Sequence, residues 1–138
     1  MKEYVLDANA VLRYFGVSEG QGTNKVRALF EQAERGQARL SMSVIHLGEV
    51  LYVLLKHVGE SRARHYVQVL QHVVTMIEAD AAQALGAAEI KHKYKLGYAD
   101  SFAAMLALTL KATLVSADPS FEKLGKTLKW VRLANFGS

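Results

Sequence analysis

Short apolar segments alternate with helix-like segments along the whole chain, and this alternation restricts the possible folds more than any other feature. The first segment, residues 2–6, contains Tyr4, Val5 and Leu6 in succession, which is typical of a strand buried on both faces of a sheet. Strands that alternate with helices form mostly parallel sheets with helices packed on both faces. We therefore expect an α/β protein with strands at residues 2–6, 39–42, 73–77, 112–116 and 128–133, and helices at residues 8–15, 23–35, 43–57, 61–71, 80–94, 99–111 and 119–124.

Residues that favour helix ends mark several of these boundaries. Thr23, Ser43 and Asp80 are suited to cap the helices at these positions, because their side chains accept a hydrogen bond from a first-turn N–H. Gly36 and Gly59 are suited to end helices. No repeat, low-complexity tract or linker-like stretch separates the elements, so we expect a single domain over residues 1–138.

Residues 16–22 contain three of the ten glycines and are expected to form a loop. The loop lacks the lysine and the following serine or threonine of a Walker motif. A phosphate-binding loop of that kind is therefore not expected.

The composition limits the kind of site that the chain can build. There is no cysteine, so disulfides and thiolate ligands are excluded, and a metal would have to bind oxygen or imidazole. The 17 lysines and arginines against 13 acidic residues give a net charge of +4, which favours polyanions mildly. Neither a cleavable leader nor an apolar run long enough to span a bilayer is recognisable, and we expect a cytoplasmic protein that does not bind membranes.

Two aspartates, Asp7 and Asp118, follow predicted strands at the sheet edge where open α/β folds hold their ligands. Each is also suited to cap the next helix, and for Asp7 alone a cap and a site residue are equally good interpretations. The repeated arrangement favours a site, because the ends of neighbouring parallel strands lie side by side.

Two further acids, Glu49 and Asp100, lie on apolar predicted helices. We expect Glu49 close to the buried face of its helix, where a carboxylate is costly unless it is paired or bound to a cation. The alternative is that Glu49 points to water. Asp100 is the sole acid in the first turn of its helix, where the helix N-terminus also stabilises negative charge.

Four carboxylates from distant parts of the chain suit one kind of chemistry in particular. Mg²⁺ and Mn²⁺ prefer oxygen ligands and leave positions open for water and substrate phosphate. Such a site can activate water for attack on phosphorus. We therefore interpret the chain as a metal-dependent phosphodiesterase.

Taken together, these segments resemble the PIN-domain ribonucleases and, among them, the small VapC-type toxins of prokaryotic toxin–antitoxin pairs. The resemblance covers essentially the whole chain. Each motif is short, but their order and separation are specific. The motifs are Val5-Leu6-Asp7-Ala8-Asn9, Glu49 on a helix after Ser43, Gly97-Tyr98-Ala99-Asp100-Ser101 and Leu114-Val115-Ser116-Ala117-Asp118-Pro119-Ser120-Phe121.

This resemblance implies a three-layer α/β/α sandwich around a mostly parallel sheet of four or five strands, and an endoribonuclease that depends on Mg²⁺ or Mn²⁺. The four acids would be the catalytic, metal-binding residues, with Asn9 and Ser116 orienting water or ligands beside them. The resemblance also implies a homodimer, an RNA substrate and a VapB-like antitoxin as protein partner.

Four basic residues are further candidates for RNA contacts. Three lie in the densest basic run, just before Asp100, where a solvated helix end is the favoured interpretation and phosphate contact the alternative. The fourth lies on the first predicted helix. These residues are Lys91, Lys93, Lys95 and Arg13.

His46 lies three residues before Glu49 on the same helical face. A partnership with Glu49 is one interpretation, and an ordinary surface or core histidine is the favoured one.

Two other functions compete with a nuclease. A phosphatase with Asp7 as nucleophile would need an acid two residues later, and Asn9 stands there instead. A catalytically silent PIN-like module that binds RNA or serves as a scaffold is the remaining alternative.

Overall fold

The computed structural model describes residues 1–17 and 22–133. Its strands form a five-stranded parallel sheet in the order β3-β2-β1-β4-β5. The strands are β1 (Lys2–Leu6), β2 (Ala38–Ser43), β3 (Val74–Ile77), β4 (Thr113–Ser116) and β5 (Trp130–Arg132). The helices are α1 (Ala8–Tyr14), α2 (Thr23–Glu34), α3 (Val44–Val58), α4 (Glu60–Val73), α5 (Ala81–Tyr94), α6 (Tyr98–Leu110) and the 3₁₀ segment η1 (Pro119–Thr127).

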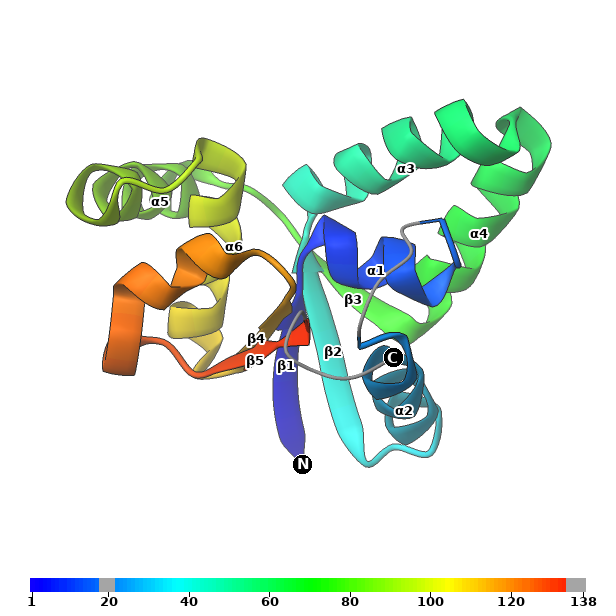
Figure 1. The fold of residues 1–138 in the computed structure, drawn as a ribbon, viewed down its shortest axis with the longest axis horizontal. Coiled ribbons are helices and arrows are strands. Elements are labelled where there is room, and N and C mark those ends of the chain that lie inside the picture. Colours follow the sequence, from blue (N-terminus) through cyan, green and yellow to red (C-terminus); the bar gives the residue numbers. More distant parts are fainter. Residues whose placement is uncertain (18–21, 134–138) are drawn as a thin grey trace.

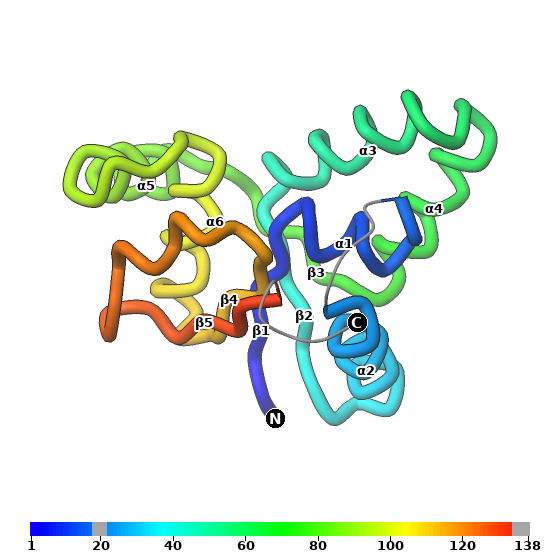
Figure 2. Tube along the Cα trace, viewed as in Figure 1, coloured from blue at the N-terminus to red at the C-terminus, as the bar shows by residue number. Residues whose placement is uncertain are grey.

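Helices cover both faces of the sheet, as Figures 1 and 2 show, so the expected three-layer α/β arrangement is confirmed. Alternate residues of the central strands supply the two cores. Leu6 and Val115 pack with α1 to α4 on one face. Val5 and Leu114 pack with α5, α6 and η1 on the other. Such strands need apolar residues at successive positions, which explains the continuous apolar run at the start of the chain.

The strand order reverses between β1 and β4. From β1 the chain builds the sheet outward through β2 to β3, and it then returns to place β4 and β5 on the other side of β1. After β1 the chain enters α1 on one face, whereas after β4 it enters η1 on the opposite face. The two connections therefore diverge at the carboxyl ends of β1 and β4, the position at which open α/β sheets bind ligands.

The predicted strands and helices are all found, with shifted ends. The last helix is the 3₁₀ segment Pro119–Thr127, which is interrupted by the non-helical backbone of Gly125 (φ 52°), the residue directly after its predicted end. Ser43 and Asp80 cap α3 and α5 as predicted, through hydrogen bonds from the backbone N–H groups of Ile45 (3.1 Å) and Gln83 (2.9 Å).

The predicted cap at Thr23 is wrong, because Gly22 occupies the N-cap position of α2. Gly22 has a φ of +91°, and a Cβ atom there would lie 2.8 Å from Cβ of Leu133. Only glycine combines this backbone conformation with such a close approach. Of the predicted loop at residues 16–22, residues 18–21 lie outside the described part of the chain.

Within residues 1–17 and 22–133, no helix has the length and apolar character needed to cross a membrane.

Candidate active site

Asp7 occupies the carboxyl end of β1 and is 2% exposed. Its Oδ1 accepts a hydrogen bond from the Ala10 N–H (3.1 Å) and so caps α1. Its Oδ2 accepts hydrogen bonds from Nδ2 of Asn9 (3.0 Å) and from the hydroxyl of Ser116. Asp7 is thus both a helix cap and a member of a polar cluster, because its two oxygens serve different partners.

Asn9 and Ser116 join the ends of β1 and β4. Asn9 accepts a hydrogen bond from the Ala117 N–H (3.0 Å) and donates to the Ser116 hydroxyl (3.4 Å). Ser116, fully buried, accepts from the Asp118 N–H (3.0 Å) while it donates to Asp7. These bonds hold the two strand ends at a constant separation across the point where the strand order reverses.

Asp118 follows β4 and caps η1, accepting a hydrogen bond from the Ser120 N–H (2.9 Å). Asp100 faces it from the first turn of α6. Partial burial of Asp100, followed by the charge of Asp118 and a hydrogen bond with it, raises the pKa of the Asp100 carboxyl to about 6. The two carboxyl groups are therefore close enough to disfavour ionisation of both.

The buried carboxyl of Asp7 has a raised pKa as well. Removal from water raises this pKa to about 6, although the hydrogen bond from Ser116 and the positive charge of His46 act in the opposite direction. The negative charge of Asp118 adds to the increase. Three aspartates from β1, α6 and β4 thus interact electrostatically in one place.

His46 lies on the first turn of α3 and is 2% exposed. Its Nε2 lies 3.0 Å from the carbonyl oxygen of Ala99, the residue before Asp100. Because a carbonyl oxygen only accepts, this ring nitrogen carries a proton. Its Nδ1 lies 2.9 Å from Oε1 of Glu49, with the alignment of an ion pair rather than that of a linear hydrogen bond.

One expectation for α3, that for Glu49, needs correction, and the one for His46 is correct only in part. Glu49 does not lie at the buried face: its side chain is 48% exposed, and His46 takes the buried place. His46 is a core histidine, as one part of the favoured interpretation had it, but the alternative interpretation, a partnership with Glu49, describes its contact. The three-residue spacing was the available signal, but periodicity does not reveal which of two polar residues on one helical face turns inward.

The pKa of His46 is the balance of opposing effects. Burial lowers this pKa, but the contact with Glu49 and the negative charge of Asp7 raise it above 6.5 in sum. A protonated His46 places a positive charge among the carboxylates and offsets part of their repulsion.

A pocket of about 210 Å³ connects these groups. Its polar lining comes from Asp7, Asn9, His46, Glu49 and Asp100. Asp118 adjoins the pocket through its contact with Asp100. The pocket therefore joins residues from β1, α1, α3 and α6 at the carboxyl edge of the sheet.

The donor groups suit a hard divalent cation. Three interacting aspartates and a half-exposed glutamate supply oxygen ligands only. The pKa values of Asp7 and Asp100 are raised first by burial and then by neighbouring negative charge, and a bound cation would offset both effects. No three His, Asp or Glu side chains in the described part of the chain already surround one point as ligands. Side-chain rotation would therefore have to accompany metal binding.

The basic candidates lie outside the pocket. Arg13 donates to the Asn9 carbonyl (3.4 Å), and Lys91 donates to the Leu96 carbonyl (3.2 Å). Lys93 lies over the ring of its neighbour Tyr94. Lys95 has a left-handed backbone (φ 58°). Its carbonyl accepts a hydrogen bond from Nζ of Lys123 (3.1 Å), a residue for which the sequence contained no signal.

Comparison with known protein families identifies one family. The profile of the PIN domain matches residues 4–127. No curated protein sequence matches the chain.

Solved structures with the same fold come from bacterial toxin–antitoxin systems. The DNA-bound VapBC from Salmonella typhimurium is 20% identical, with a TM-score of 0.74 over 96% of this chain and 99% of that chain. VapBC2 from Rickettsia felis, bound to a fragment of promoter DNA, is 18% identical, with a TM-score of 0.73 over 94% and 98%. VapC20 from Mycobacterium tuberculosis, a Sarcin-Ricin loop cleaving toxin, is 16% identical, with a TM-score of 0.64 over 88% and 95%.

Proposed function

The chain belongs to the PIN domain family, and from this premise we propose that it is an endoribonuclease that depends on Mg²⁺ or Mn²⁺. The observation that carries the proposal is the group of three aspartates, Asp7, Asp100 and Asp118, gathered where the strand order reverses. Glu49 would complete the set of acids from the rim of the pocket.

Each residue of the site has a distinct task in this proposal. A divalent cation, when bound to the four acids, would supply a Lewis acid that activates water and neutralises phosphate charge. Asp7 cannot rotate freely, because both of its oxygens accept hydrogen bonds from the protein. Asn9 and Ser116 would hold Asp7 in place, as groups behind a metal ligand commonly do.

His46 would position two acids at once. It contacts the Glu49 carboxylate directly and is bonded to the backbone immediately before Asp100. Its ring therefore connects α3 to α6 on opposite sides of the pocket.

The similar structures support a toxin with a protein partner. Several contain VapB together with VapC, and one is a toxin that cleaves the sarcin–ricin loop. We propose RNA as the substrate and a VapB-like antitoxin as the partner of this chain. A homodimer is proposed on the same grounds, and light scattering of the purified protein would test it. Contacts of phosphate with Arg13, and with Lys91, Lys93 and Lys95 at the end of α5, belong to the same proposal.

The decisive experiment is RNA cleavage by the purified protein with added Mg²⁺ or Mn²⁺ and with a chelator. We expect cleavage only with the metal ion, and a loss of at least about a hundredfold in Asp7→Asn and Asp100→Asn, since an oxygen ligand is removed in each. Full activity of both variants, or cleavage in chelator, would contradict the proposal. RNA binding without turnover in all conditions would identify a silent binding module instead.

A further inference from the structure

The net positive charge of the chain comes from its last third. Residues 91–133 contain eight lysines and arginines against three acidic residues, a net charge of +5. Residues 1–90 contain nine basic against ten acidic residues, a net charge of −1. Two of the three acids in the later segment, Asp100 and Asp118, belong to the candidate site. The surface contributed by this segment is therefore more basic than the overall charge of +4 suggests.

These cations are also poorly compensated. In the earlier segment three arginines form ion pairs with glutamates: Arg35–Glu31, Arg39–Glu3 and Arg64–Glu60. In the later segment only Arg132 does so among the described residues, with Glu122. No described lysine of this segment forms an ion pair with an acidic side chain, so none of their charges is neutralised in that way.

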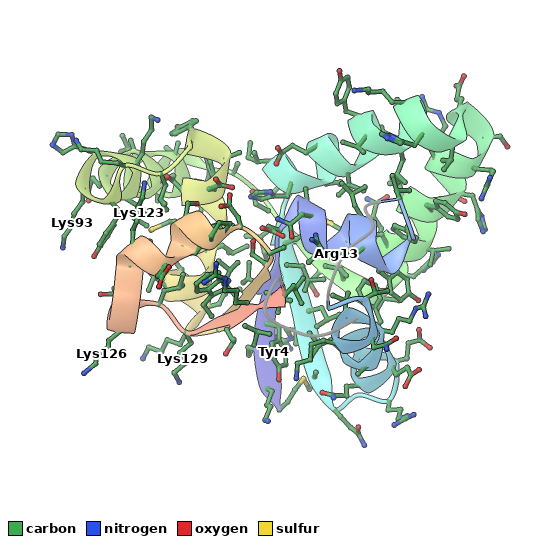
Figure 3. All side chains as sticks on the ribbon, in the orientation of Figure 1. Tyr4, Arg13, Lys93, Lys123, Lys126 and Lys129 are labelled. Carbon is green, nitrogen blue, oxygen red and sulfur yellow. The ribbon has the colours of Figure 1, made fainter. Side chains whose placement is uncertain are left out.

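We group six of these lysines, which belong to α5, η1 and the segments that precede α6, β4 and β5, under the name basic flank. Nζ of Lys123 on η1 lies 3.1 Å from the carbonyl oxygen of Lys95, which joins η1 to the end of α5. Lys111 and Lys129 line a common hollow of about 280 Å³. Figure 3 shows four of these lysines on the α5 and η1 side of the molecule, away from Arg13. The basic flank consists of Lys93, Lys95, Lys111, Lys123, Lys126 and Lys129, and all six are exposed.

The basic flank adjoins the candidate site along the chain at two points. η1, which carries Lys123 and Lys126, begins immediately after Asp118. The turn that contains Lys95 leads into α6, whose first turn carries Asp100. An anionic polymer that leaves the pocket along the end of α5 and along η1 would therefore meet the lysines of these two elements.

We infer that the basic flank binds the phosphate backbone of RNA beyond the nucleotides held in the pocket. This inference rests on the proposed function. The lysines are spread over α5, η1 and the segments that precede α6, β4 and β5 rather than enclosed in one pocket, which suits a long polyanion and not a small ligand. Lysine binds phosphate as a point charge without reading sequence, so the basic flank would favour extended or structured RNA regardless of its bases.

The test compares two triple variants with equal loss of charge. The first replaces Lys93, Lys126 and Lys129 with glutamine. The matched control replaces the exposed Lys2, Lys25 and Lys56, which lie on β1, α2 and α3. Each variant also removes one lysine that lies over a tyrosine ring. Nζ of Lys93 lies 5.3 Å from the ring centre of Tyr94, and Nζ of Lys56 lies 5.4 Å from that of Tyr52.

Binding is measured by fluorescence anisotropy with a single-stranded 20-nucleotide RNA and a 4-nucleotide RNA, in chelator, over a range of salt concentrations. On single strands each phosphate contact contributes about −0.7 to the slope of log affinity against log salt concentration. Loss of three lysine contacts should therefore make this slope less steep by about 2 in the first variant. We expect its affinity for the 20-mer to fall at least about tenfold at 100 mM salt, and its affinity for the 4-mer to change less than about twofold. The control should bind both RNAs as the wild type does.

The inference is overturned if both triple variants bind the 20-mer equally, if the 4-mer is affected as strongly as the 20-mer, or if the wild type binds neither. If the basic flank binds an acidic protein instead of RNA, both triple variants should bind the 20-mer equally. Because binding is measured in chelator without cleavage, its result is independent of the nuclease test, and an inactive protein could still show the effect.

Discussion

The ring of His46 lies 2.9 Å from the carboxylate of Glu49, and the ring is buried whereas the glutamate is half-exposed. The same ring contacts the Ala99 carbonyl, so one side chain links the helix that carries Glu49 to the helix that carries Asp100. This link is the basis of the first prediction.

Replacing His46 with phenylalanine should weaken both the fold and the site. The substitution retains an aromatic ring but leaves the Ala99 carbonyl without its donor, at an expected cost of about 1–3 kcal/mol in the free energy of unfolding. Glu49 also loses its contact, so Mn²⁺ affinity, measured by calorimetry, should fall as well. His57→Phe is the matched control, since His57 lies on the same helix, is exposed and has a hydrogen bond to the backbone of its own helix at Val53 (2.9 Å). Equal Mn²⁺ affinity in the two variants would contradict a positioning role for His46.

The metal-free protein should lose stability as pH rises from about 4 to about 6. Below its unfolded pKa of 3.8, Asp7 is protonated in both states and carries no penalty. Above the folded pKa of about 6 it is charged in both states, and the penalty is complete. A shift of about two units corresponds to roughly 3 kcal/mol, which Asp7→Asn should recover in part at pH 7. Urea denaturation from pH 4 to 8 in chelator measures this difference, and parallel curves for both proteins would refute it.

Divalent ions should stabilise the wild-type protein against unfolding, and this stabilisation should be smaller at acidic pH. At pH 7 both Asp7 and Asp100 are mostly ionised and can bind a cation, whereas below pH 6 protons compete for the same oxygens. Thermal melting is measured with 5–10 mM Mg²⁺, a concentration roughly tenfold above the Kd of a typical weak site. The increase in Tm should be smaller at pH 5 than at pH 7.5. Asp100→Asn should reduce the increase. Asp80→Asn removes a carboxylate outside the site while an amide oxygen can still cap α5, and it should leave the increase intact. An increase of equal size at both pH values would argue against these ligands.

Replacing Ser116 with alanine should shift the acid limb of RNA cleavage to higher pH. The Ser116 hydroxyl donates to Asp7 and lowers the pKa of its carboxyl, so its removal should raise that pKa above about 6. The pH–rate profile measures the shift. Thr109→Ala removes an exposed hydroxyl that donates to the Met105 carbonyl within α6, and it should leave the profile unchanged. A Ser116→Ala profile that coincides with that of the wild type would contradict the pKa argument.

Replacing Gly22 with alanine should destabilise the fold more than the same change at Gly36. Both glycines have positive φ angles, which costs an alanine of the order of 1 kcal/mol. At Gly22 the added Cβ would also lie 2.8 Å from Cβ of Leu133, whereas at Gly36 no atom among the described residues lies within 4 Å of it. The difference between the two free energies of unfolding isolates the steric contribution. Equal losses would show that Leu133 moves aside at little cost.

Local sequence patterns predicted most of the fold, because they act through neighbouring residues. The run Tyr4-Val5-Leu6 followed by an aspartate and a helical pattern indicated both the strand and the cap that Asp7 forms. Asp118 followed from the same reasoning at β4. The predicted cap of α2 was wrong: the N-cap residue is Gly22, whose backbone lies close to Leu133, a residue more than a hundred positions away.

Sequence patterns by themselves determined which elements form and which acids stand at their ends. Tertiary structure alone decided that β4 lies beside β1, that His46 rather than Glu49 turns inward, and that Lys123 meets the turn at Lys95. The reason is physical: caps and periodicity depend on groups within a few residues, whereas burial of a polar side chain depends on a partner that only the folded chain brings near. For His46 that partner is the Ala99 carbonyl, 53 residues away.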